Sequence, residues 1–339
     1  MVSFPVHHFD PAHGRVVPRV SVLAGGLSSE REISLASGTA VATALRELGE
    51  EVRELDPSEV QVSHCDWEPG EVALLALHGR GGEDGQIQLE LERIGVAYTG
   101  CGVAASRQAF RKSRAKACFE MAGVPTPEAM ILERGSDPVL PIGLFDRCGS
   151  AVVVKPDAQG SSLGVRLVRK PSDYSEALEL AFSLGSRVLV ERAVLGPEWT
   201  VGWLDDQPLP PTLIETPRGL FDFEANYEDT ETGLTFPSPV PGSTAAQVIQ
   251  VSRRACEAIG TRGLVRVDLR VDEAGNPWVL EVNTIPGLTA HSLVPRAAAE
   301  AGLELGQLAR QMILSASNTL RGCHIRQDQM TGFLPRAVS

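Results

Sequence analysis

Two strand-like segments near the C-terminal end constrain the fold of this chain most. The sequences LVRVDLRV (264–271) and PWVLEVN (277–283) alternate apolar and polar residues, and they flank the turn sequence DEAGN. Alternation with a period of two predicts strands that have one apolar and one polar face. The pattern therefore predicts an antiparallel hairpin whose charged side chains gather on one side of a sheet.

The register of this hairpin brings charged groups together. If the turn is centred on DEAGN, Asp268 faces Glu281 and Arg266 faces Asn283, all on one face. Two facing carboxylates repel unless a cation lies between them or one is protonated. Carboxylate and amide oxygens are ligands that suit Mg²⁺ shared with phosphate groups. The alternative interpretation is a surface hairpin with scattered charges.

Two loops have the composition of anion-binding segments. In VVVKPDAQGSSLG (152–164), Lys155 ends an apolar strand, and the following glycines, Ser161 and Ser162 offer close approach and donors to phosphate oxygens. The alternative is an ordinary Gly/Ser turn. The loop IPGLTAHS after the hairpin leads to a predicted helix start at Ser292, a suitable place to hold a carboxylate.

The N-terminal third alternates strands and helices. Strand patterns at 19–24 and 72–77 each precede a helical pattern, at 29–48 and 86–94. Such βα units predict a parallel sheet with loops at the carboxyl ends of its strands. The GG-x-x-S loop does not match the GxGxxG fingerprint, which argues against a nicotinamide-binding domain. The first helix is expected to bury an apolar stripe of Ile33, Ala36, Ala40 and Ala44.

The remainder has a similar mixture of elements. One helix with a basic face is expected over 106–123, and strands and helices alternate as far as about residue 320. The order of these elements predicts three regions: 19–104, 105–192 and 193–320. The basic face of the 106–123 helix consists of Arg111, Lys112, Arg114 and Lys116.

The composition is that of a water-soluble acidic protein. Apolar residues make up 43%, charged residues 22%, and the net charge is −12, which argues against nucleic acid or an anionic membrane as the main partner. No run of 18 apolar residues occurs, and the six cysteines form no CxxC pair. We therefore expect a cytoplasmic protein with reduced thiols.

Seven segments resemble motifs of the D-alanine–D-alanine ligases of the ATP-grasp superfamily, over roughly residues 19–320. They are AGGLSSEREISLASG, LALHGRGGEDGQIQ, YTGCG, VVVKPDAQGSSLG, FDFEANY, GLVRVDL and LEVNTIPGLTAHSLVP. The resemblance implies a three-domain ATP-grasp α/β fold, with a doubly wound parallel sheet in the N-terminal domain and a mobile loop at 215–242. It also implies that ATP phosphorylates the carboxylate of one D-alanine and that the amine of a second attacks the acylphosphate.

The resemblance assigns residues to ATP and metal. Asp268, Glu281 and Asn283 match ligands of two Mg²⁺ (or Mn²⁺) ions that bridge the ATP phosphates. Lys112 and Lys155 match lysines that contact the same phosphates. The other matching positions around the nucleotide are Ser161, Ser162, Glu191 and Glu198.

Further positions match substrate-binding and catalytic groups. Arg266 matches the group that stabilises the oxyanion of the tetrahedral intermediate. Glu30 matches the anchor of the first D-alanine's ammonium, and His78 lies near the carboxylate of that substrate. Glu30, Ser161 and Tyr227 match a hydrogen-bonded triad of the family. The second substrate is assigned to Gly287, Ser292 and Leu293.

Several of these matches have a purely structural alternative, and three positions depart from the family pattern. Glu30 could simply favour the helix dipole, His78 could be a satisfied strand-end histidine, and Tyr227 an ordinary loop aromatic. Asn226 stands where a lysine usually precedes that tyrosine, so we expect weaker ATP use or altered loop closure. The other departures are Arg192, where lysine is frequent, and Arg111, where an acidic residue is common.

Three functions compete. The leading hypothesis is a homodimeric D-alanine–D-alanine ligase in peptidoglycan precursor synthesis, with ATP and D-alanine as substrates. A related ligase with D-lactate, D-serine or another amino acid as second substrate is the nearest alternative. A nucleotide-binding module without catalysis is disfavoured, because the metal-ligand and oxyanion positions all keep their residues.

Overall fold

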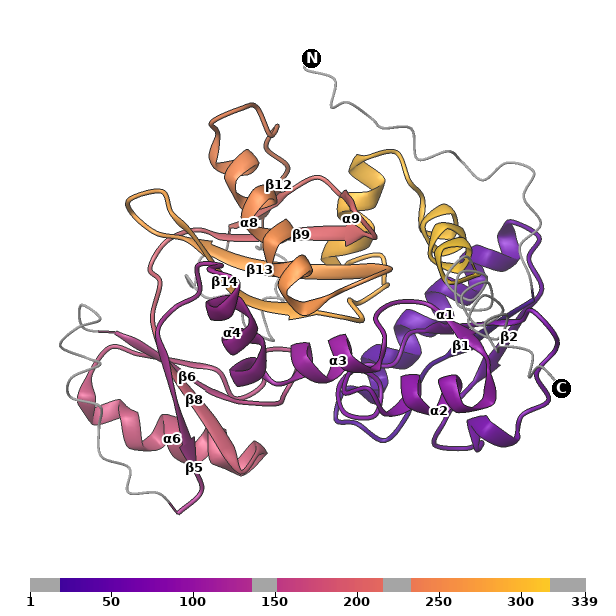
Figure 1. Cartoon of the computed structure of the whole chain (residues 1–339), viewed down its shortest axis with the longest axis horizontal. Coiled ribbons are helices and arrows are strands. Elements are labelled where there is room, and N and C mark those ends of the chain that lie inside the picture. The colour runs from indigo at the N-terminus through magenta and orange to yellow at the C-terminus, as the bar shows by residue number, and fades with distance from the viewer. Residues whose placement is uncertain (1–18, 136–150, 216–232, 318–339) are drawn as a thin grey trace, which may run out of the picture.

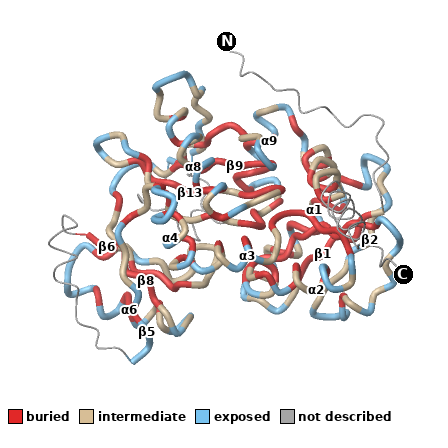
Figure 2. Tube along the Cα trace, viewed as in Figure 1, coloured by how far each residue is buried: buried red, intermediate tan, exposed pale blue. Residues whose placement is uncertain are grey.

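The computed structural model describes residues 19–135, 151–215 and 233–317, and these residues form three sheets with flanking helices (Figure 1). The sheet nearest the N-terminus lies apart from the other two, with helix α3 between them, and helix α4 lies between the other two sheets. Buried segments run along β1, β6, β8, β9 and β13 (Figure 2). The α/β class expected from the sequence is confirmed.

The first sheet is entirely parallel, as predicted. Its order is β2-β1-β3-β4, from Val52–Leu55, Val20–Leu23, Val72–Leu75 and Ala97–Tyr98. Strands β1 and β3 are fully buried, as the unbroken apolar runs require. The main covering helices are α1 (Arg31–Glu47) and α2 (Gln86–Ile94), with a short 3₁₀ turn at Val62–His64.

The buried face of α1 differs from the predicted one. Ala36 is exposed, and the buried positions are Ser34, Ser37, Gly38, Val41, Ala42 and Leu45. Hydrogen bonds explain the difference, because Ser34 Oγ accepts from Gly25 N at 2.8 Å and donates to the Ala76 carbonyl at 2.7 Å. The helix therefore turns its serines toward the ends of β1 and β3 to satisfy loop backbone groups.

The second sheet is antiparallel, with order β5-β8-β6-β7. Its strands are Ala129–Glu133, Arg187–Arg192, Val152–Pro156 and Arg166–Val168. Helix α6 (Tyr174–Leu184), preceded by a 3₁₀ turn at Pro171–Asp173, packs on β6 and β8 and buries one apolar face.

The third sheet contains the predicted hairpin. Its order is β12-β11-β9-β13-β14, and β10 pairs with β9. The strands are Gly233–Thr235, Thr212–Glu215, Glu198–Leu204, Leu264–Val271 and Pro277–Asn283, with β10 at Gln207–Pro208. The register is confirmed: Asp268 pairs with Glu281 and Arg266 with Asn283, and a bulge follows Asp268. Helix α8 (Thr244–Ile259) covers one face and begins at Ser243, whose Oγ accepts from Ala246 N.

The prediction of a single helix over 106–123 is wrong. Two helices occur instead, α3 (Val103–Phe110) and α4 (Lys112–Met121), and Arg111 between them is extended. The new helix starts because Asp157 caps it from the second sheet: its carbonyl accepts from Lys112 N and its Oδ1 from Ser113 N, both at 2.8 Å. Both helices pack against β14 and α8.

The C-terminal helices return the chain to the first sheet. Helix α9 (Leu293–Glu300) and a helix over 305–317 share a hydrophobic core with β1, β3 and α1. None of the helices within the described ranges is both long and apolar enough to cross a bilayer.

Candidate functional site

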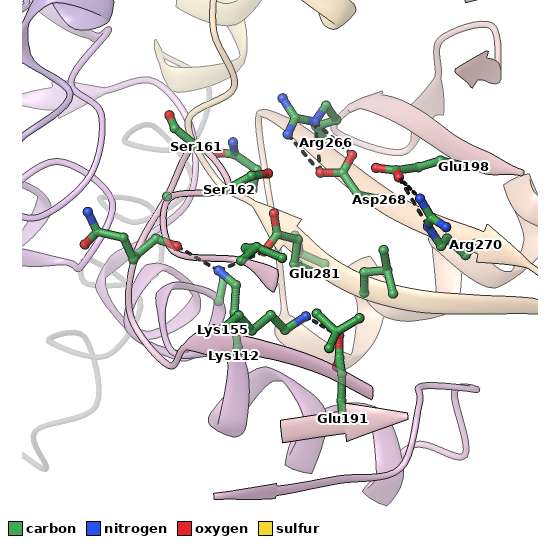
Figure 3. Close-up of a pocket in the computed structure, with 18 of the residues that line it drawn as sticks. Lys112, Lys155, Ser161, Ser162, Glu191, Glu198, Arg266, Asp268, Arg270 and Glu281 are labelled. Carbon is green, nitrogen blue, oxygen red and sulfur yellow. Dashed lines mark hydrogen bonds and ion pairs between the residues drawn. The ribbon is translucent and has the colours of Figure 1, made fainter. Parts of the chain in front are cut away.

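A pocket lies where the three sheets approach one another, and thirteen of the residues assigned to ATP, metal, substrate or catalysis line it. They are Glu30, His78, Lys112, Lys155, Ser161, Ser162, Glu191, Glu198, Arg266, Asp268, Glu281, Asn283 and Gly287. Figure 3 draws 18 of its residues and labels ten of them, with the third-sheet charges facing the loop of the second sheet. Segments far apart in sequence therefore form one site.

The polar face of the hairpin is held by cations. Arg266 grips Asp268 with two nitrogens, Nε to Oδ1 at 2.9 Å and Nη2 to Oδ2 at 2.8 Å. Thr200 Oγ1 also donates to Asp268 Oδ1, at 2.7 Å. Across the hairpin, Lys112 Nζ lies 2.9 Å from Glu281 Oε2. The expected repulsion between the facing carboxylates is thus offset by one basic side chain for each.

Lys112 links the hairpin to the Gly/Ser loop. Besides its ion pair with Glu281, its Nζ donates to the Gln159 carbonyl at 2.8 Å. Although burial opposes ionisation, the neighbouring Glu281 raises the pKa of Lys112 above its usual value. The same lysine and Lys155 hold the pKa of Glu281 well below its usual range, against the effect of burial. Both groups are therefore charged at neutral pH.

A buried ion cluster forms the floor of the pocket. Glu191 Oε1 pairs with Lys155 Nζ, and Glu191 Oε2 lies 2.9 Å from Lys116 Nζ. All three side chains are at least 94% buried. Lys116 also donates to Thr126 Oγ1 and to the Pro127 carbonyl. Despite the cost of burial, the two ammonium groups keep the pKa of Glu191 low, so the carboxylate stays ionised.

Glu30 lies at the start of α1 and contacts the Gly/Ser loop of the second sheet. Ser161 Oγ donates to Glu30 Oε2 across the interface. Burial, together with the nearby Glu83, raises the pKa of the Glu30 carboxyl to about 7. Glu30 makes no side-chain capping hydrogen bond at the start of this helix. The side chain faces the pocket rather than serving only its own helix.

Two glycines make room for this carboxylate. A Cβ on Gly160 would lie 2.5 Å from Glu30 Oε1, and one on Gly79 would lie 2.7 Å from the same atom. Gly160 does not have positive φ, so a side chain there would act through this contact and would force the Glu30 carboxylate to move. Gly79 and Gly160 thus allow two loops to pack against the Glu30 carboxylate.

Substituting Gly160 with alanine should therefore destabilise the protein. We expect Gly160→Ala to lower the free energy of unfolding by about 1–3 kcal/mol, the usual cost of overpacking, measured by urea denaturation. Gly185→Ala is the matched control, because its added Cβ would meet only the Arg187 carbonyl at 3.8 Å. Equal stabilities of the two variants would contradict the packing described here.

His78 joins the first sheet to the loop after the hairpin. Its Nδ1 donates to the Ile285 carbonyl at 3.1 Å, and its Nε2 lies 3.1 Å from Ser37 Oγ. Ser37 Oγ in turn accepts from Leu288 N at 3.2 Å. Because a carbonyl only accepts, the Nδ1 atom carries the hydrogen. The buried ring is thus satisfied on both nitrogens while it still lines the pocket.

The residues assigned to the second substrate lie at different depths. Gly287 lines the pocket, whereas Ser292 and Leu293 lie behind it and are buried. Ser292 Oγ accepts from Thr289 N at 3.2 Å and lies 2.9 Å from Thr289 Oγ1. A Cβ on Gly287 would come within 2.8 Å of Ser292 Oγ. Tyr227 and Asn226 lie outside the described residues, as does most of the predicted loop 215–242.

Some pocket residues were not assigned from the sequence. Arg270 pairs with Glu198 through Nη2 at 2.7 Å. It lies on the same face of its strand as Arg266 and Asp268, so the period of two could have predicted its position. Lys116 does not line the pocket, but it pairs with the lining residue Glu191; the sequence placed it only on the basic face of the predicted helix. Glu83 also lines the pocket.

Arg192, noted as a departure, also lines the pocket. Its guanidinium stacks on Trp278 with 4.3 Å between the guanidinium carbon and the ring centroid. The Trp278 indole donates to Asp272 Oδ2 at 2.9 Å. Stacking on Trp278 therefore fixes the Arg192 side chain against the third sheet. A lysine would stack less well, because it lacks the planar guanidinium group.

Comparisons with known proteins agree on one family. A family model described as D-Ala D-Ala ligase C-terminus matches residues 118–314. A D-alanine–D-alanine ligase of Pseudomonas putida is 41% identical over 304 residues, covering 90% of this chain and 94% of the relative. One from Halorhodospira halophila is 42% identical over 297 residues, covering 88% and 95%.

Solved structures give the same result. The D-alanine–D-alanine ligase of Bacillus anthracis superimposes with a TM-score of 0.78 at 30% identity, covering 90% of this chain and 99% of that one. A structure of the Bacillus anthracis enzyme complexed with ATP has a TM-score of 0.75 at 28% identity, with the same coverage.

Proposed function

Because the chain belongs to the D-alanine–D-alanine ligase family, we propose that it joins two D-alanines into D-alanyl-D-alanine while converting ATP to ADP and phosphate. The product serves peptidoglycan precursor synthesis. The division into domains at 19–104, 105–192 and 193–320, the dimeric state and the cytoplasmic location belong to the same proposal.

One observation carries the proposal: the polar face of the hairpin, Lys155 of the second sheet and Lys112 of helix α4 converge on a single pocket (Figure 3). Carboxylates on one wall and ammonium groups on the other are what a Mg²⁺-bound triphosphate requires. Lys112 and Lys155 are assigned to the phosphates, with Ser161 and Ser162 as further donors. Glu191 and Glu198 are assigned to the nucleotide, and Glu191 also pairs with Lys155.

The donor set fits Mg²⁺. Asp268, Glu281 and Asn283 offer carboxylate and amide oxygens from adjacent strands, and all three line the pocket. Within 19–135, 151–215 and 233–317, no cluster of three or more His, Cys, Asp or Glu side chains is gathered as a self-sufficient metal site. This suits ions whose remaining ligands are phosphate oxygens and water. Bound there, Mg²⁺ would neutralise phosphate charge during phosphoryl transfer.

The chain's own groups then do the following. Glu30 holds the ammonium of the first D-alanine, and a carboxylate oxygen of that D-alanine attacks the γ-phosphorus as the bond to ADP breaks. Arg266 stabilises the oxyanion that forms when the amine of the second D-alanine attacks the acylphosphate carbonyl. Phosphate leaves, and the attacking amine loses a proton. Gly287, Ser292 and Leu293 form the wall for the second substrate, with His78 bracing that wall against the first sheet.

The raised pKa of Glu30 predicts a pH-dependent Michaelis constant for D-alanine. With a pKa of about 7, the carboxylate fraction rises about tenfold between pH 6 and pH 8. Since only the carboxylate attracts an ammonium, the KM for the first D-alanine should fall about tenfold over that range. The KM for ATP, measured in the same assays, serves as the control and should change less than twofold. A pH-independent KM for D-alanine would contradict the role of Glu30.

The direct test is phosphate release by the purified chain with ATP and Mg²⁺. D-Alanine should stimulate release, and L-alanine, the matched control, should leave it at the background rate. Equal stimulation by both enantiomers, or none by either, would overturn the proposed function.

A further inference from the structure

A second groove beside the pocket is lined by arginines. Its lining includes Arg80 from the loop after β3, Arg107 from α3, and Arg111 and Arg114 from the α3–α4 junction and α4. Asp84, Gln86, Phe110 and Ala158 complete it. All four arginines are exposed, and α3 and α4 lie between the sheets of the molecule (Figure 1).

The arginines of this groove outnumber the single acidic residue in its described lining. None of the four arginines makes an ion pair with a side chain in the described ranges. The one acidic lining residue, Asp84, is engaged elsewhere: its Oδ1 accepts from Gln86 N at 3.1 Å and its Oδ2 from Gln86 Nε2 at 2.6 Å. Four positive and one negative group leave a net charge of +3 in a chain of net charge −12.

The groove adjoins the proposed ATP pocket. Phe110 lines both hollows, so one aromatic side chain separates them. Helix α4 contributes to both: Lys112 faces the pocket and pairs with Glu281, whereas Arg111 and Arg114 face the groove. An anion held in the groove is therefore next to the lysine assigned to the phosphates.

We propose that this arginine groove captures the triphosphate of ATP on its way into the pocket and so raises the rate of nucleotide association. An acidic surface repels a polyanion, whereas a local basic patch concentrates it and guides it inward. Guanidinium forks suit phosphate oxygens. This inference rests on the proposed function, because ATP is the anion. Arg111, a departure from the family pattern, is one of the four contributors.

The test is the association rate of a methylanthraniloyl-labelled ATP with the full chain and Mg²⁺, followed by stopped-flow fluorescence at several ionic strengths. The wild-type rate should fall steeply as salt is added. The double variant Arg107→Glu, Arg114→Glu should associate about tenfold more slowly at low ionic strength, with a much weaker salt dependence. Its kcat at saturating ATP should match that of the wild type. The neutral pair Arg107→Gln, Arg114→Gln should give a smaller change in the same direction.

The matched control is Arg93→Glu, Arg169→Glu, which changes the net charge equally at exposed positions that line neither hollow. It should keep the wild-type rate within twofold. Groove variants that behave like this control would overturn the proposal, as would a slower rate with unchanged salt dependence. The test is separable from the proposed function, because nucleotide association is observed whether or not D-alanine is joined.

Discussion

Arg266→Ala should lower kcat for dipeptide formation by about 10²–10³-fold, the usual effect of removing an oxyanion donor. Arg266 lies on β13 within the pocket and is oriented by hydrogen bonds from its Nε and Nη2 atoms to Asp268. That fixed orientation lets it stabilise developing charge without first reorganising. The measurement is steady-state phosphate release at saturating ATP and D-alanine.

Two comparisons separate this effect from a general loss of structure. Arg266→Lys keeps the charge but loses the two-nitrogen grip on Asp268, so its kcat should be intermediate between those of the wild type and Arg266→Ala. The thermal midpoint of each variant shows whether the fold survives. A folded Arg266→Ala variant that keeps more than half of the wild-type kcat would show that Arg266 does not stabilise the transition state.

Glu191→Gln should be the most destabilising single change in the pocket. It removes the carboxylate that pairs with both buried ammonium groups, those of Lys116 and Lys155, and breaking a buried ion pair in this way costs about 3–5 kcal/mol. The free energy of unfolding, from urea titration at pH 7, measures the loss. Adding Lys116→Met to this variant removes one uncompensated cation and should restore part of the stability.

The control for this prediction is Glu133→Gln in the same sheet. Glu133 is largely exposed, and its contact with Arg187 is 3.8 Å long, so its loss should change stability by less than about 0.5 kcal/mol. Similar losses for Glu191→Gln and Glu133→Gln would contradict the buried-cluster account. Strict additivity of Glu191→Gln and Lys116→Met would show that the two groups do not interact.

Local patterns were sufficient to predict the hairpin. A centred turn and the period of two fix which residues face one another, and Asp268 and Arg266 pair as the counting rule requires. The parallel first sheet followed from βα alternation for the same reason: neighbouring residues carry the signal. Arg270, two positions beyond Asp268 on the same face, could have been added by that rule.

The features that were not predicted depend on contacts between residues far apart in the sequence. Helix α4 begins at Lys112 because Asp157, far away in sequence, accepts from its first N–H groups, and nothing in the local sequence marks that break. Ser37 is buried because it contacts His78 and Leu288, so an apolar stripe was the wrong criterion for α1. Lys116 has a specific partner, Glu191, only once the second sheet has formed.

The measurement that most directly tests the central claim is the mass of the product formed from ATP, Mg²⁺ and D-alanine, with D-lactate and D-serine offered in parallel reactions. The site described here predicts D-alanyl-D-alanine from D-alanine alone, with one ADP and one phosphate for each dipeptide. A product found only when D-lactate or D-serine is present would contradict the assigned second substrate. Nucleotide binding without any product would contradict catalysis itself.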